Sequence, residues 1–244
     1  MKSLINKFII ISLLSIISNA DISEDKLHDY LKVSSGGAMF LSYHSDTLIK
    51  FARKGYDKKT LKGMLDDDKY LNLFTSEVVL LNDFHYDNII EFYSTDVGKK
   101  YTKSMYDMVK INQNKIKELF SQYQCSNDKQ KLISKIGDAL NLIELRMSSI
   151  KESLHELNSL QPNNLKKSIS EMEILESTLE SKLVKHEKIM SCIRYKDFTL
   201  NELKELYIYA SSESGKYEAE LMYRGFGRYL KVFMSDLKKL PRLK

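Results

Sequence analysis

Two apolar stripes of similar length, separated by a break at Gln161–Asn164, constrain the fold of this chain most strongly. Spacings of four and three residues alternate along the first stripe, a heptad pattern that keeps one helix face turned toward a partner helix. Pro162 ends that helix because it lacks a backbone N–H and disfavours helix in the preceding residue. The first stripe consists of Ile136, Leu140, Ile143, Met147, Ile150, Leu154 and Leu157, and the second of Leu165, Ile169, Met172, Leu175, Leu179, Leu183, His186 and Met190. The pattern predicts an antiparallel helical hairpin, with coiled-coil packing, over residues 121–195.

A short internal repeat flanks this hairpin. The stretch EFYSTDVGKKY, which begins at Glu91, recurs in weaker form as IYASSESGKY from Ile208. Thr95 and Ser212 are each placed to cap a helix that follows a sharp bend. A glycine at the third helical position ordinarily costs up to about 1 kcal/mol, so we expect its missing Cβ to let the preceding helix fold back closely. The repeat therefore predicts two related helix–bend–helix units, in which the corresponding residues are Phe92 and Tyr209, Thr95 and Ser212, and Gly98 and Gly215.

A complete helix-start signal precedes the second copy. Thr199 is placed to cap a helix, and Glu202, three residues later, can accept a hydrogen bond from the Thr199 amide. Phe198 and Leu203 occupy the two ends of a hydrophobic staple. We therefore expect a helix that begins after Thr199 and runs to about Ala210.

These motifs resemble the bacterial family known as domain of unknown function 2059. The second copy carries the whole pattern, and the first copy carries only its end. The family usually has Pro after the small polar residue, where this chain has Asp96 and Glu213. The matching residues are Phe198, Thr199, Glu202, Leu203, Leu206, Tyr209, Ser212, Gly215 and Lys216 in the second copy, and Phe92, Tyr93, Thr95, Val97, Gly98 and Lys99 in the first. The resemblance implies an exported, all-helical bacterial protein and supplies no catalytic residue.

The N-terminal segment predicts a secretory leader. Lys2 and Lys7 precede a short apolar run from Phe8 to Ile17, and small residues follow it up to Ala20. The run is too short to span a bilayer, which takes about 20 residues. We expect cleavage between Ala20 and Asp21 and a periplasmic or secreted protein.

The low content of helix breakers defines the fold class. With only 2 Pro and 9 Gly in 244 residues, long helices are favoured over a turn-rich β fold. We expect an all-α helical bundle with a central antiparallel hairpin and two helix–bend–helix units. The expected divisions are the leader at 1–20, an N-terminal helical region at 21–120, the hairpin at 121–195 and a C-terminal helical region at 196–244.

Motifs that carry catalysis or bind metals or cofactors are missing from the sequence. The five His occur in no HExxH pattern, and Glu152-x-x-His155 stands alone, whereas helical di-iron sites need two such pairs. No G-x-S-x-G or glycine-rich phosphate loop is present. The formal charge of +5, which falls to +3 when Lys2 and Lys7 leave with the leader, is too mild to indicate nucleic acid. We predict no catalytic residue, metal or cofactor.

The two cysteines predict a disulfide. Export supplies an oxidising setting, and Cys125 and Cys192 both fall near the open base of the hairpin if the first arm begins near Asn127 or Lys129. A bond there would stabilise by about 4 kcal/mol. The alternative is a pair of separately buried thiols.

The C-terminal segment is basic on one face and apolar on the other. Its apolar stripe includes Met222, Phe226, Tyr229, Phe233 and Leu237. Such a helix either lies on an anionic membrane surface or packs its stripe into the core with a solvated basic face. The candidate surface-binding residues are Arg224, Arg228, Lys231, Lys238 and Lys239.

Together these patterns predict a non-enzymatic protein of the bacterial envelope. We expect it to act by binding another envelope protein or by self-association through its helices, and we expect no nucleic-acid partner. Attachment to anionic envelope lipids or polymers through the basic segment is the alternative, and an enzyme of unrecognised type is a third.

Overall fold

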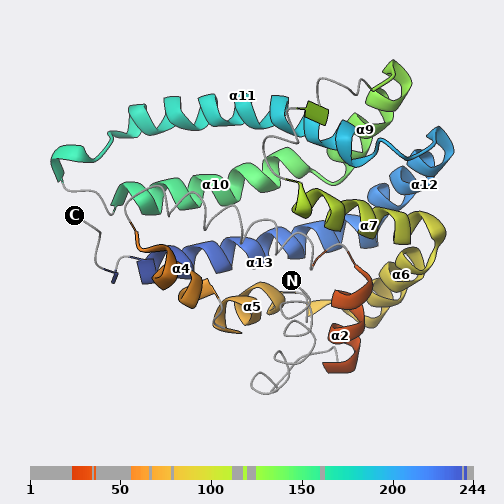
Figure 1. Cartoon of the computed structure of the whole chain (residues 1–244), viewed down its shortest axis with the longest axis horizontal. Coiled ribbons are helices and arrows are strands. Elements are labelled where there is room, and N and C mark those ends of the chain that lie inside the picture. Colours follow the sequence, from red (N-terminus) through yellow and green to blue (C-terminus); the bar gives the residue numbers. More distant parts are fainter. Residues whose placement is uncertain are drawn as a thin grey trace.

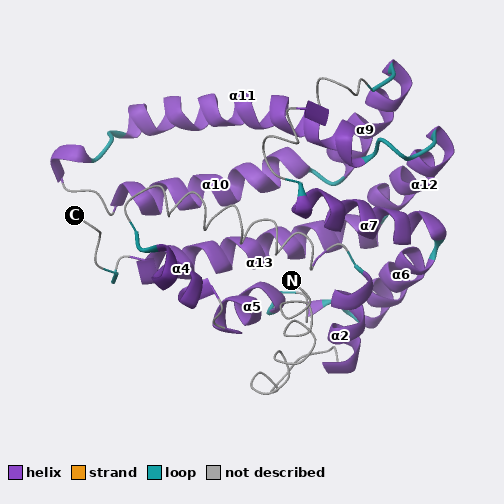
Figure 2. Cartoon of the chain, in the orientation of Figure 1, coloured by secondary structure: helices purple, strands orange, loops and turns teal. Residues whose placement is uncertain are grey.

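The computed structural model describes residues 24–34, 36, 56–65, 68–77, 80–111, 118–119, 125–159, 163–237 and 239–240. All regular structure in these ranges is helical, without any strand (Figure 2), which confirms the predicted all-α class. None of the described helices is long and apolar enough to cross a bilayer. The predicted leader and Pro162 lie outside the described residues.

The first five α-helices of the described chain precede the cysteines, and the rest form the remainder of the bundle. The early helices are α2 (Glu24–Val33), α4 (Lys58–Leu65), α5 (Asp68–Thr75), α6 (Asp83–Ser94) and α7 (Asp96–Lys110). The later elements are α9 (Asn127–Ala139), α10 (Leu142–Ser159), the short 3-10 helix η2 (Asn163–Leu165), α11 (Ile169–Arg194), α12 (Leu200–Ser211) and α13 (Glu213–Leu237).

The helices stack in layers around α13 (Figure 1). Helix α11 is outermost on one side and covers α9 and α10, and α10 in turn packs on α13. On its other side α13 contacts α5 and α6, and α2 packs against α6. Large side chains of α13, such as Tyr229 and Phe233, are fully buried, so this helix forms the centre of the core.

The first arm of the predicted hairpin is not one continuous helix. Helix α9 ends at Ala139, and Asn141 adopts a left-handed backbone conformation with φ of 49° before α10 begins. Asparagine is one of the few residues other than glycine that adopts this conformation readily at a helix end. The Asn141 carbonyl also accepts from Leu145 N at 3.0 Å, so one residue ends α9 and starts α10. The first arm of the hairpin, marked by one continuous apolar stripe, is therefore divided between α9 and α10.

The second arm also begins later than its apolar stripe predicts. Ser168 caps α11, and its hydroxyl and amide exchange hydrogen bonds with Glu171 in a capping box. Leu165 lies instead in η2, and both Leu165 and Ile169 are exposed. The first buried residue of the stripe is Met172. Helices α10 and α11 run antiparallel (Figure 1).

Candidate functional site

Helix pairs α6–α7 and α12–α13 agree in their local structure. Helices α6 and α12 both have 12 residues, and each begins at a capping side chain, Asn82 or Thr199, that accepts from the backbone N–H three residues later. Each helix then ends at a sharp bend, where Thr95 accepts from Gly98 N at 3.0 Å and Ser212 from Gly215 N at 3.1 Å. The offset that relates Thr95 to Ser212 also relates Asn82 to Thr199.

The two glycines permit these bends. Gly98 and Gly215 are the third residues of α7 and α13. A Cβ at Gly98 would lie 2.1 Å from the Phe92 carbonyl oxygen, and one at Gly215 would lie 2.2 Å from the Tyr209 carbonyl oxygen. Both contacts are with backbone, which cannot rotate away as a side chain can. Any larger residue would therefore force the two helices of the pair apart.

Thr199 and Glu202 form the predicted capping box, and the structure adds a partner to it. The Thr199 amide donates to the Glu202 carboxylate at 2.6 Å, and Phe198 and Leu203 on either side are buried. Lys100 of α7 also donates to this carboxylate at 2.7 Å, which ties α7 to α12. The hydrogen bond from Lys100 lowers the pKa of Glu202 most, and the bond from the Thr199 amide lowers it further.

The two helix pairs pack against each other. Helix α6 contacts α13, and α12 contacts α7, so the first helix of each pair meets the second helix of the other. The rings of Phe92 and Tyr209, which occupy corresponding positions, stack with centroids 3.7 Å apart. One corresponding pair from the two sequence copies, Phe92 and Tyr209, is therefore in contact in the structure.

A buried carboxylate lies behind this stack. Glu218 of α13 accepts hydrogen bonds from the phenol groups of Tyr30 at 2.7 Å, Tyr93 at 3.1 Å, and Tyr209. Burial raises the pKa of Glu218, and the three phenol donors oppose that rise. Burial and the nearby carboxylate raise the pKa values of Tyr30 and Tyr209. A void of about 40 Å³ beside Glu218 has room for a few water molecules and no larger ligand.

An open groove of about 520 Å³ lies on the surface side of the stacked rings. Phe84 of α6 and Ile208 of α12 line it and are 61% and 69% exposed. The rings of Phe92 and Tyr209 also line it, as do the capping residues Thr95 and Ser212. Among the residues that the structure describes, its charged lining residues are all acidic: Glu91, Glu205 and Glu213. A hydrophobic groove with an acidic rim thus forms where the two helix pairs meet.

Most of the basic residues predicted to bind a surface have acidic partners. Arg224 and Arg228 lie 2.8 and 2.7 Å from the carboxylate of the buried Glu77, within ion-pair distance although not aligned as hydrogen bonds. Lys239 pairs with Asp236 at 2.7 Å. Lys231 is exposed, and Lys238 lies outside the described residues.

The apolar stripe of α13 is likewise engaged within the protein. Met222, Phe226, Tyr229, Phe233 and Leu237 are all buried in the main hydrophobic cluster. The stripe would have to be exposed to insert into a membrane surface. The described fold instead matches the core-packed alternative, with the basic face outside.

The predicted disulfide is confirmed. Cys125 and Cys192 are bonded, with Cα atoms 5.7 Å apart, and separately buried thiols are excluded. Cys125 lies just before α9, whose cap is Ser126, and Cys192 lies near the end of α11. The bond therefore fixes the start of the first arm to the end of the second.

No cluster of three or more potential metal-ligating side chains occurs in the part of the chain that the structure describes. His155, from the isolated Glu-x-x-His, instead lies 2.8 Å from Glu176 across the α10–α11 contact.

Sequence reasoning missed the tyrosine cluster around Glu218 and the cap at Asn82. The offset between the two copies could have revealed Asn82, because Asn is a good helix cap. The acidic residues around the groove do not repeat as a set between the two sequence copies. Comparison with protein family models, curated proteins and solved structures finds no match, so the resemblance to domain of unknown function 2059 stays an expectation.

Proposed function

We propose that this chain is an exported, non-enzymatic binding protein that holds a cationic, amphipathic protein segment in the groove between α6 and α12. The observation that carries the proposal is the pairing of exposed Phe84 and Ile208 with a rim whose charges are all acidic. Exposed apolar side chains bordered by polar ones mark interaction sites. Like-signed charge around them selects the opposite charge on the partner.

The groove has the form of a preorganised binding surface. Its floor is the Phe92–Tyr209 stack, which is held from behind by the bond from Tyr209 to Glu218. Its edges are the two helix bends, which the glycines fix. A rigid surface loses little conformational entropy on binding, so more of the contact energy appears as affinity.

The chemistry near the groove suits binding better than catalysis. Glu218, the buried acid nearest to it, is surrounded by three phenol donors. A general acid or base has to reach a substrate proton within hydrogen-bond distance. Tyr209 stands between Glu218 and the groove, with its ring lining the groove and its hydroxyl bonded to the carboxylate.

The disulfide supports the exported part of the proposal. Disulfides persist in oxidising compartments and are rare in the bacterial cytosol. Together with the predicted leader at residues 1–20, the Cys125–Cys192 bond favours the envelope or the exterior as the place of action.

Photo-crosslinking in the native organism tests the proposal. A benzoylphenylalanine replaces Ile208 in the groove or, as the control, Ile174, which is similarly exposed on α11. We expect a defined adduct from position 208 only, with the crosslink mapping to a basic segment of the captured protein.

Charge reversal tests the role of the rim. Glu91→Lys with Glu205→Lys should abolish the adduct, whereas Glu173→Lys with Glu180→Lys on α11 should leave it unchanged. Equal adducts at both positions, or an adduct that survives reversal of the rim, would reject the groove as the binding site.

A further inference from the structure

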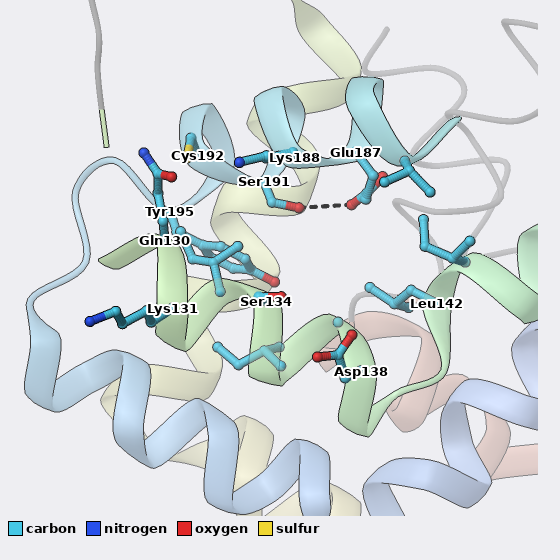
Figure 3. Close-up of a pocket in the computed structure, with 15 residues that line it drawn as sticks. Gln130, Lys131, Ser134, Asp138, Leu142, Glu187, Lys188, Ser191, Cys192 and Tyr195 are labelled. Atoms are coloured by element: carbon cyan, nitrogen blue, oxygen red, sulfur yellow. Dashed lines mark hydrogen bonds between the residues drawn. The ribbon is translucent and has the colours of Figure 1, made fainter. Parts of the chain in front are cut away.

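A second concave site lies between α9, α10 and α11, away from the groove. It is a cavity of about 370 Å³, at the lower end of the roughly 300–1,000 Å³ typical of small-molecule sites. Figure 3 shows side chains from these helices converging on it. Its aliphatic lining consists of Ile133 and Ile136 from α9, Leu142 and Ile143 from α10, and Val184 from α11.

A buried ion-pair network forms one wall of the cavity. Glu187 accepts from Ser191 Oγ at 2.8 Å (Figure 3) and from Arg194 at 3.2 Å, and it also contacts Arg146. Burial alone would raise the pKa of Glu187, but the two guanidinium groups outweigh it and hold the pKa at about 2. Two arginines therefore more than neutralise this carboxylate, and the wall does not repel an anion.

Two lysines add positive charge at the cavity. Lys131 of α9 and Lys188 of α11 both line it and are exposed. In Figure 3 Lys188 lies toward the same end of the cavity as Gln130, and the Lys131 side chain extends outward at that end, while Asp138 lies with Leu142 toward the other end. The lysine end therefore favours a negatively charged group, and the aliphatic side chains favour a hydrocarbon chain.

The disulfide keeps the cavity formed. Cys192 itself lines it, and its bond to Cys125 fixes the end of α11 beside the start of α9. A site that exists before the ligand arrives loses less free energy on binding.

We infer that this cavity binds a single acyl chain with an anionic head, with the chain among the aliphatic side chains and the head at Lys131 and Lys188. Its volume of about 370 Å³ suits one chain better than two, and the lysines at one end disfavour a cationic head there. A free fatty acid and a single-chain anionic lipid share this chemistry. The inference is independent of the groove and its partner.

Gly137 offers a sharp test, because it lines the cavity in α9 and a Cβ there would meet nothing within 4 Å. Gly137→Leu should therefore fill the cavity without distorting the helix. Gly63 in α4 is equally open and does not line the cavity, so Gly63→Leu is the matched control. Thermal unfolding should show both variants folded and no less stable than the parent, since leucine is the better helix former.

The binding probe is cis-parinaric acid, whose fluorescence reports transfer into an apolar site. We expect binding by the parent and by Gly63→Leu, and affinity at least about tenfold weaker for Gly137→Leu. No saturable binding by the parent up to about 100 µM, or binding that Gly137→Leu leaves intact, would overturn the inference.

Competition by dodecanoate and dodecanol tests the head group, and sodium dodecyl phosphate tests whether other anionic heads are accepted. Dodecanoate should compete more strongly than dodecanol with the parent, and Lys131→Glu with Lys188→Glu should remove that preference. Lys135→Glu with Lys185→Glu, on the same helices but outside the cavity lining, should retain it.

Equal competition by acid and alcohol with the parent would refute the assigned role of the two lysines. Competition by the phosphate would extend the ligand class to single-chain anionic lipids, and its failure would restrict the class to fatty acids.

Discussion

The ring of Phe92 lies against the ring of Tyr209, with their planes 4° from parallel and their centroids 3.7 Å apart. The carbonyl oxygens of the same two residues accept from the cap amides of Thr95 and Ser212, both at 3.0 Å. The ring stack and the two bends are therefore structurally coupled, because Phe92 and Tyr209 take part in both. A change at either bend should disturb the floor of the groove as well as the helix pair.

Alanine at either glycine should reveal this coupling. Gly98→Ala or Gly215→Ala should lower the free energy of unfolding by about 1–3 kcal/mol, because the new methyl group meets backbone. Gly63→Ala, in open space, should instead raise it by up to about 1 kcal/mol. Urea unfolding followed by circular dichroism measures all three. Stabilisation by alanine at 98 or 215 would disprove the close approach.

Acid should weaken the contact of α11 with α10 through Glu187. Its pKa is about 2 in the folded protein and ordinarily 4.5, so its stabilising effect is present above about pH 4.5 and is lost as pH falls toward 2. Glu187→Gln should cost about 3 kcal/mol at pH 7, since two partly buried arginines lose their carboxylate. The difference from the parent should shrink steadily below pH 4.5 in denaturation curves. A deficit that stays constant from pH 7 to pH 3 would contradict this assignment.

Glu218 should show the opposite pH dependence. Because its pKa is raised in the folded state, its favourable contribution is full below the ordinary value of 4.5 and is lost as pH rises through the folded value. Glu218→Gln keeps an acceptor for the phenols and removes the titration, so its melting temperature at pH 8 should equal or exceed that of the parent. As pH falls to 5, the melting temperature of the parent should rise relative to that of the variant. A variant that is less stable than the parent by the same amount at both pH values would count against a raised pKa.

Reduction of the disulfide should lower the free energy of unfolding of the protein while leaving its core folded. The bond joins residues 67 positions apart, so its loss should cost about 4 kcal/mol in the chain-entropy model. Cys125→Ser with Cys192→Ser, compared with the oxidised parent in urea, measures this cost. Mass spectrometry after alkylation without reduction should find neither cysteine modified in the parent, and modification of both would exclude the bond.

Local signals explain why part of the fold was predictable. The Thr199–Glu202 capping box depends on residues three apart, and the disulfide depends on where two helices begin and end. The break at Asn141 was missed because the apolar stripe continues in register from Leu140 to Ile143. Hydrophobic spacing reports which face is buried, and it does not report whether one residue between turns adopts a left-handed conformation.

The buried acids were not predictable from local sequence. In the sequence, Glu218 cannot be told from any other charged residue on a polar helix face. Its partners Tyr30 and Tyr93 lie more than a hundred positions away along the chain. The same holds for Glu77, whose neutralising arginines belong to α13. Such groups are identified only when distant helices are brought together.

The central position of α13 has a consequence for biosynthesis. This helix follows every other described helix in the chain, yet α5, α6, α10 and α12 all pack against it. During translation these earlier helices therefore lack their common packing surface until α13 has left the ribosome, and their apolar faces remain exposed meanwhile. Chaperones that recognise such faces would hold the nascent chain until α13 is complete.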